Sequence, residues 1–235
     1  MPCTLSAALA DAAVCRGSFH AVLRTDVPDA VFAAFSAALQ KAQAEGRILT
    51  ASLFRCEAHL FFYAEGLNRP FTPQGLCPAL DAALLPWPPA LGETAPRPWA
   101  AMQPYFYHDV PTTAADWQQG RCPQRRRGRI ALLPPDKWCS YMEHHLRIVT
   151  EGLVEGDRWH LICVQEGVLF SYLEEPRTNV NIRHQLGAHS PELDAWIAAD
   201  PESHFARFTP EQKATRTAAT TLYFCPALRE RRTEP

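Results

Sequence analysis

The sequence contains one set of patterns twice, in the same order, and this repetition limits the folds open to the chain more than any other feature. Each copy has an apolar run with a Pro-Asp helix start, a second paired apolar run, a Pro-x-Leu-Asp segment and a closing aromatic run. The matched segments are 20–35 with 129–145, 51–65 with 160–174, 78–87 with 191–200, and 105–111 with 222–228. The offset grows from 107 residues (Pro28 to Pro135) to 113 (Pro78 to Pro191), as loop insertions would produce. Because solenoid repeats run at roughly 20–50 residues, this period indicates two copies of one small domain.

Each copy is expected to fold as strand–helix–strand–strand–helix–strand, from its hydrophobic periodicity and its helix-start signals. That order is typical of the split-βαβ, ferredoxin-like unit, which leaves one face of its sheet to be covered. We therefore predict an α+β fold of two tandem ferredoxin-like repeats, stacked as an intrachain dimeric α+β barrel. The predicted boundaries are 19–111 for a degenerate first repeat, 112–128 for an arginine-rich linker and 129–228 for the second repeat. The internal duplication predicts an intrachain pseudo-dimer, compatible with a monomeric protein.

Composition narrows the functional classes. The net charge is −2 and the isoelectric point is near 6.5, so bulk charge favours neither nucleic acid nor an anionic membrane as partner. The eight cysteines include no close pair, no CxxC and no zinc-type spacing with histidine, so the sequence predicts neither a disulfide framework nor a zinc site. No 18-residue apolar stretch and no secretory signal pattern are found, which predicts a soluble, cytoplasmic chain. The arginine run at 121–129 is interpreted as part of the solvated linker.

A candidate site lies on the helix expected at 134–149. Tyr141 and His145 are four residues apart, so they lie side by side on its apolar face. The first copy has Ala34 and Ala38 at the aligned positions, so the pair occurs in one copy only. A histidine on an apolar helix face is more often a hydrogen-bonded packing residue, and that alternative stays open.

The second copy resembles the L-rhamnose mutarotase family, through PDKWCSYMEHH, HLICVQEGVLFSYLEE and a tryptophan-bearing helix, and the first copy resembles it more weakly. The resemblance implies that His145 is the catalytic proton donor and that Tyr141 contacts a sugar. A further sugar-contacting tyrosine of the family falls at His160, and the family's paired tryptophans reduce to Trp196. His145 is thus the predicted catalytic residue, with Tyr141, His160 and Trp196 as substrate-binding residues and no metal.

The chemistry that the resemblance implies suits these residue types. Mutarotation moves protons at the ring oxygen and the anomeric hydroxyl, which an imidazole can do near neutral pH without a cofactor. The main hypothesis is a sugar isomerase of carbohydrate metabolism that interconverts the anomers of a deoxy- or aldohexose. Two alternatives remain open: a non-catalytic small-molecule-binding or interaction protein, and a cofactor-independent oxygenase or isomerase of a biosynthetic pathway.

Overall fold

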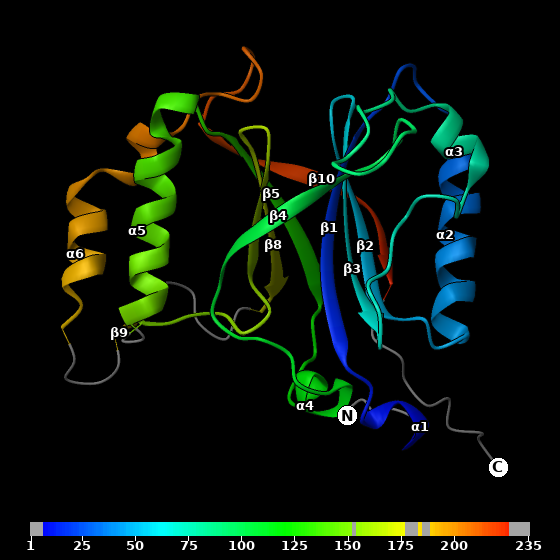
Figure 1. Ribbon diagram of the computed structural model, residues 1–235, viewed down its shortest axis with the longest axis horizontal. Helices are drawn as coiled ribbons and strands as arrows, with labels where there is room; N and C mark the ends of the chain where they lie inside the picture. The colour runs from blue at the N-terminus through cyan, green and yellow to red at the C-terminus, as the bar shows by residue number, and fades with distance from the viewer. Residues whose placement is uncertain (1–6, 152–153, 177–182, 185–188, 226–235) are drawn as a thin grey trace. The chain divides into compact units, whose positions relative to one another are not determined.

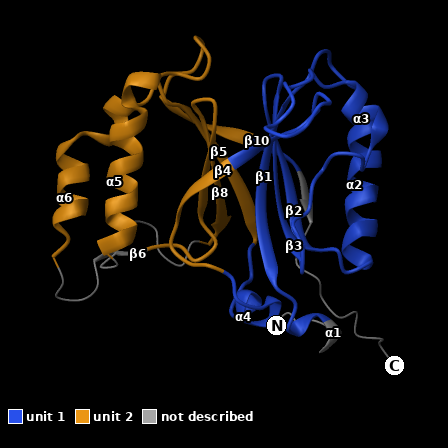
Figure 2. Cartoon of the chain, in the orientation of Figure 1, with its two compact units in different colours: residues 1–102, 111–123, 220–235 blue, residues 103–110, 124–219 orange. Residues whose placement is uncertain are grey.

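The computed structural model describes residues 7–151, 154–176, 183–184 and 189–225 (Figure 1). The chain divides into two compact units (Figure 2). Unit 1 takes its described residues from 1–102, 111–123 and 220–235, and unit 2 takes them from 103–110 and 124–219. Residues 226–228, the end of the predicted second repeat, lie outside the described part of the chain.

Unit 1 holds most of the N-terminal half of the chain. Its elements are α1 (Ala7–Ala10), β1 (Val14–Val22), α2 (Asp29–Ala44), β2 (Ile48–Cys56), β3 (His59–Leu67), α3 (Pro78–Ala82), the start of β4 (Ala100–Tyr107), α4 (Ala114–Gln118) and the end of β10 (Arg216–Cys225). Strand β3 pairs antiparallel with both β1 and β2. The strand and helix types expected between residues 20 and 84 are present in the predicted order.

An aromatic core joins α2 to the strands of unit 1. Helix α2 follows Pro28 and buries Phe35, Leu39 and Ala42, spaced so that they lie on one face. The Phe35 ring lies 5.8 Å from Phe62 of β3, centroid to centroid. These side chains are fully buried, so this face of the sheet is filled by packed side chains.

A buried ion pair fixes α4 and the residues after it to the same sheet. The guanidinium of Arg121 donates to both Glu65 carboxylate oxygens at 2.7 and 2.9 Å, with both side chains fully buried. The Tyr63 hydroxyl and the Trp117 indole N–H also donate to Glu65, at 2.6 and 3.0 Å. Four donated hydrogen bonds therefore offset the desolvation of this carboxylate.

Unit 2 holds the candidate site. Its elements are the end of β4, β5 (Arg125–Leu132), the 3₁₀ helix η1 (Pro135–Lys137), α5 (Trp138–Glu151), β6 (Val154–Glu155), β7 (Leu161–Gln165), β8 (Val168–Glu175), β9 (Arg183–His184), α6 (Pro191–Ala198), the 3₁₀ helix η2 (Pro201–His204) and the start of β10. Strand β8 pairs antiparallel with β5 and β7, while β6 and β9 form a separate two-stranded sheet.

Local sequence explains the turns and caps of unit 2. Strands β7 and β8 form the predicted hairpin, whose turn residues Glu166 and Gly167 both have positive φ, as a two-residue hairpin turn of this kind requires. A side chain at 167 would come within 2.8 Å of the Leu133 carbonyl oxygen, which glycine avoids. Helix α6 begins at Pro191, in the Pro-x-Leu-Asp segment, and the Ser190 hydroxyl caps it by accepting from the Leu193 N–H at 3.0 Å.

Two strands contribute to both units, and they correct the predicted fold class. Strand β4 pairs with β1 through Ala100–Met102 and with β7 through Gln103–Tyr107. Strand β10 pairs with β5 through Arg216–Ala219 and with β2 through Thr220–Cys225. The order β1-β3-β2-β10-β5-β8-β7-β4 therefore closes into one antiparallel barrel of eight strands.

The predicted α+β fold of two ferredoxin-like repeats, each with its own sheet, is thus wrong. The closing aromatic runs at 105–111 and 222–228 had each been assigned to the sheet of their own repeat. Hydrogen bonds instead carry much of β4 to β7 and much of β10 to β2. A hydrophobic pattern predicts that a segment is a strand, but it leaves the neighbour of that strand undetermined.

The segment predicted as an arginine-rich linker has regular structure. Residues 112–128 include α4, where the Thr113 side chain caps the helix by accepting from the Asp116 N–H, and the first residues of β5. Arg126 is buried and donates to Glu174 at 2.9 Å. Arg127 pairs with Glu175 at the surface. Of the helices that the structure describes, each is too short or too polar to cross a bilayer.

Candidate active site

Unit 2 contains a cavity of about 190 Å³ that is lined by residues of that unit alone. Part of its wall is apolar and mostly aromatic, including Phe106, Tyr141, Ile162, Leu169, Trp196 and Phe205. The polar part includes His108, Arg129, His145, Asp157, His160 and Arg216. An apolar pocket with a few convergent polar groups is the usual form of a small-molecule site.

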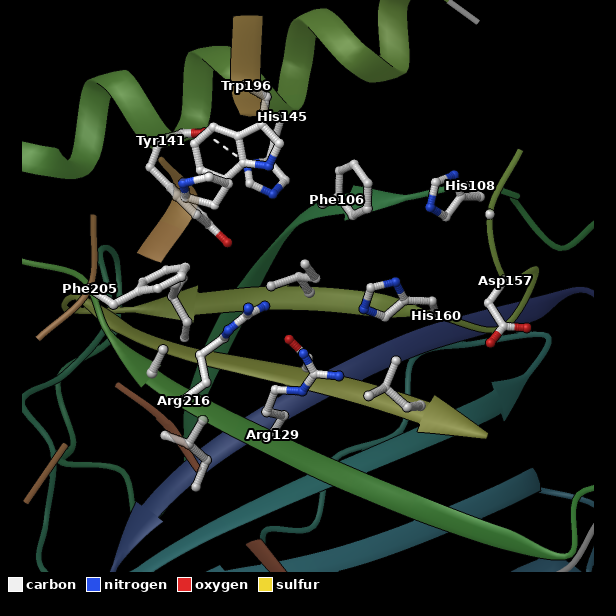
Figure 3. Close-up of a pocket in the computed structure, with 18 residues that line it drawn as sticks. Phe106, His108, Arg129, Tyr141, His145, Asp157, His160, Trp196, Phe205 and Arg216 are labelled. Atoms are coloured by element: carbon white, nitrogen blue, oxygen red, sulfur yellow. Dashed lines mark hydrogen bonds between the residues drawn. The ribbon is translucent and has the colours of Figure 1, made fainter. Parts of the chain in front are cut away.

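Helices and strands supply opposite walls of this cavity. Tyr141 and His145 project from successive turns of α5, while Arg129 and Arg216 come from β5 and β10 on the other side (Figure 3). Trp196 comes from α6, beside His145. The helical spacing of four therefore delivers a phenol and an imidazole to one spot, facing two guanidinium groups.

The His145 ring is held by aromatic contacts and by its own helix. Its centroid lies 4.2 Å from that of Tyr141 and 4.9 Å from those of both Trp196 and Phe106, with the Phe106 ring perpendicular. His145 Nδ1 donates to the backbone carbonyl of Tyr141 at 2.9 Å, since a carbonyl can only accept. In the neutral ring this hydrogen bond places the proton on Nδ1 and the lone pair on Nε2.

Burial keeps both groups of the α5 pair neutral at physiological pH. Burial lowers the pKa of His145 to about 4, helped by the nearby His144 and His204 and opposed by the hydrogen bond to Tyr141. Burial also raises the pKa of Tyr141 to about 12. His145 can therefore accept a proton at neutral pH, and Tyr141 can donate a hydrogen bond without ionising.

The strand wall carries the positive charge. Arg216 forms an ion pair with Glu202 of η2, and the Thr215 hydroxyl donates to the same carboxylate at 2.6 Å. Arg129 is half-buried and lies directly opposite Ser171 in the β5–β8 ladder. The arginines oppose the effect of burial on the pKa of Tyr141, and Glu202 reinforces it.

A second polar group lies at the end of the cavity lined by β4. The rings of His108 and His160 are 6.3 Å apart, and Asp157, which is buried, lies close by in the chain (Figure 3). A Cβ at position 156 would overlap the His108 ring, so glycine at this position allows the ring its place. The end of β4 and the residues before β7 thus bring imidazoles and a carboxylate together.

All four residues predicted for the site line this one cavity: Tyr141, His145, His160 and Trp196. Their individual roles stay predictions. Residues that the sequence reasoning missed are Phe106, His108, Arg129, Asp157 and Arg216. Arg129 had been interpreted as the end of a solvated linker, and Arg216 had not been singled out.

The buried positions of α2 and α5 indicate which residue of unit 1 corresponds to His145. Helix α2 buries Phe35 and Leu39, and α5 buries Tyr141 and His145 at the same spacing of four. By this pattern Leu39, rather than the expected Ala38, occupies the equivalent place. The two helices thus differ by the replacement of an aliphatic core residue with a titratable one.

The described residues include no group of three or more histidine, cysteine, aspartate or glutamate side chains placed to hold a metal ion. The histidines of the cavity are spread along its length, from His145 on α5 to His108 after β4.

Comparisons with known proteins give two distant matches among solved structures. No family model and no curated protein matches the chain. A solved structure from Fusobacterium nucleatum subsp. nucleatum, described as "Putative monooxygenase", is 11% identical, has a TM-score of 0.45 and matches over 93% of this chain and 97% of its own. A structure described as an "anthrone oxidase-like protein" is 8% identical, has a TM-score of 0.38 and matches over 89% and 92%.

The predicted sugar isomerase is corrected on these findings. Neither solved structure is described as a mutarotase or as a rhamnose enzyme. The cavity itself gives the physical reason, because Arg129 and Arg216 suit an anion better than an uncharged deoxyhexose. The assignments to isomerase, rhamnose and carbohydrate metabolism are therefore withdrawn.

Proposed function

We propose that this chain is a cofactor-independent oxygenase that acts on a small ring compound with an acidic C–H or O–H group. His145 is the general base in this proposal. One observation carries it: a buried imidazole, with its tautomer set by the Tyr141 carbonyl, lines a cavity opposite two arginines. The alternative of an oxygenase was already open from the sequence.

Because the pKa of His145 is low, the protonated ring must be stabilised by a nearby negative charge. With a pKa of about 4, the ring is almost wholly neutral at physiological pH, but it holds a captured proton weakly. A substrate that becomes an anion beside the ring raises the pKa of His145 again, because opposite charges stabilise each other. Arg129 and Arg216 favour the same anion from the strand wall, so proton transfer and charge stabilisation occur together.

The oxygenation step balances without a further redox partner. For an activated methylene, His145 removes one proton, and the carbanion gives an electron pair to O₂ and forms a C–O bond. The peroxide takes up the proton, and loss of the second C–H proton breaks the O–O bond and releases water. The net reaction converts the methylene and O₂ into a ketone and water, with the substrate as the sole reductant.

The apolar wall suits this chemistry. O₂ is apolar, and Phe106, Ile162 and Trp196 give it a surface to occupy near the ring of His145. Tyr141 can orient a substrate oxygen, since its phenol stays protonated.

Oxygen uptake with 2-indanone as a small activated-methylene probe tests the proposal. The wild-type protein should consume one O₂ for each ketone formed. His145→Asn should lower kcat/KM by about 10²–10⁴, the usual contribution of a general base. His144→Asn is the matched control, because it changes the neighbouring imidazole of α5, which does not line the cavity.

Two results would contradict the oxygenase. One is binding of 2-indanone to the wild-type protein without oxygen uptake, which would favour the non-catalytic binding alternative. The other is equal activity of His145→Asn and His144→Asn. Since the pKa of His145 is lowered to about 4, kcat/KM should also fall on the acid side near that pH rather than near 6.5.

A further inference from the structure

Arg129 and Arg216 converge on one region of the cavity although they are far apart in the sequence. In the antiparallel ladder of β5 and β10, Arg129 is paired with Ala218 and Arg216 with Ala131, so the two positions are diagonal neighbours on adjacent strands. Both side chains line the cavity, and both extend toward the side that Tyr141 occupies (Figure 3). Such a pair presents two planar sets of donors to one ligand.

The partner of Arg216 lies at the edge of the cavity and can be exchanged. Glu202 belongs to η2, next to Pro201 and Phe205, which line the cavity. Its ion pair with Arg216 is partly exposed, with 42% of the arginine side chain and 48% of the glutamate side chain accessible. Such exposed pairs contribute little to the stability of a protein. A ligand carboxylate inside the cavity can therefore compete for the guanidinium.

The charges of both arginines act inside the cavity as well as at its surface. Each of them favours the ionised form of Tyr141, against the stronger effect of burial, while Glu202 disfavours it. The phenol thus senses the same three groups that a bound anion would meet. Both the geometry and this electrostatic effect indicate that a negative charge is best accommodated beside Arg129 and Arg216.

We propose that Arg129 and Arg216 bind a carboxylate of the ligand, which replaces Glu202 as the partner of Arg216. The ligand class is a single-ring aromatic carboxylate, with the ring between Phe106, Trp196 and Phe205. The size fits, because a cavity of about 150 Å³ accepts benzene and this one has about 190 Å³. The proposal deepens the proposed oxygenase by naming its substrate class, but binding requires no proton abstraction.

Benzoate and benzamide are matched probes, because they share a shape and differ in charge. Titration calorimetry should show that the wild-type protein binds benzoate at least about tenfold more tightly than benzamide. Arg129→Gln and Arg216→Gln should each reduce this preference to about twofold or less. Arg127→Gln is the control on β5, since its side chain pairs with Glu175 outside the cavity and its loss should leave the preference intact.

Further variants address the exchange at Arg216 and the folding of the substituted proteins. Glu202→Gln removes the competing charge and should tighten benzoate binding about threefold or more, and an unchanged affinity would overturn the exchange. Circular dichroism checks that each variant is folded. If either Gln variant fails to fold, Arg129→Lys and Arg216→Lys take its place. Lysine keeps the positive charge without the planar fork, so these variants should keep part of the preference for benzoate.

The carboxylate site is overturned by equal wild-type affinities for the two probes, by a benzoate Kd weaker than about 10 mM, or by a preference retained in either Gln variant. These outcomes are separate from those of the oxygenase test. Benzoate has no activated methylene, so selective binding of benzoate without any oxygen uptake from 2-indanone would retain the anion site and reject the oxygenase. Oxygen uptake without benzoate selectivity would do the reverse.

Discussion

Replacing His145 with asparagine should make the protein less sensitive to acid. In the unfolded chain a histidine has a pKa of about 6.5. In the folded protein, burial lowers the pKa of His145 to about 4. As the pH falls below about 6.5, the unfolded chain therefore takes up a proton that the folded protein does not. Wild-type stability is lost through this window, because protons bound by the unfolded state favour unfolding.

The size of the effect follows from the two pKa values. At about pH 5 the unfolded site is almost fully protonated, while the folded site is about one-tenth protonated. The difference in proton uptake between about pH 7 and pH 5 lowers the free energy of unfolding by about 2 kcal/mol. At about pH 4 the loss reaches about 3 kcal/mol. Asparagine does not titrate, so His145→Asn lacks this contribution but keeps an amide that can donate to the Tyr141 carbonyl.

Urea denaturation of both proteins at several pH values measures the effect. The variant should be less stable at about pH 7, because it loses ring contacts with Phe106 and Trp196, and the gap should narrow by about 2 kcal/mol at about pH 5. Contributions from other histidines cancel in the difference. A gap that is constant across this range would mean that His145 titrates normally, and the account of His145 as a buried, neutral base would be wrong.

Three further substitutions test the packing around the site and in unit 1. Glu65→Gln should destabilise the protein by about 3–5 kcal/mol in urea denaturation, because it leaves Arg121 buried without its carboxylate; a loss under about 1 kcal/mol would contradict this. Phe35→Ala should cost about 3–5 kcal/mol of unfolding free energy by removing a fully buried ring, whereas a melting temperature equal to that of the wild type would argue against a packed core at α2. Ser190→Ala should cost about 1–2 kcal/mol by removing the cap of α6, and an unchanged denaturation midpoint would show that the cap contributes nothing.

The sequence predicted the local elements well and their pairing partners poorly. The helix starts near Pro28 and Pro191 were readable, because proline, capping side chains and apolar spacing act within a few residues. The destination of β4 was not readable, since an apolar strand satisfies its hydrogen bonds equally well beside β1 or β7. The closed barrel depends on that choice.

In the candidate site, too, the residues on one helix could be predicted, and those brought together by strand pairing could not. Tyr141 and His145 could be found from one helix, because a spacing of four places two side chains together. Arg129 and Arg216 meet only through the pairing of β5 with β10, which joins residues 87 positions apart in the sequence (216 − 129). Whether each of these arginines faces solvent or a cavity depends on this long-range register.

Strand β4 pairs with both β1 and β7, and this has a consequence for any attempt to express part of the chain. Phe106 and His108 belong to the N-terminal half of the chain, yet they complete the wall beside His145. A gene fragment that begins at position 129 would encode the imidazole, the phenol and both arginines, but it would leave the edge of β7 exposed and the chamber open on one side. Residues 129–235 alone would therefore lack part of the wall that lies beside His145.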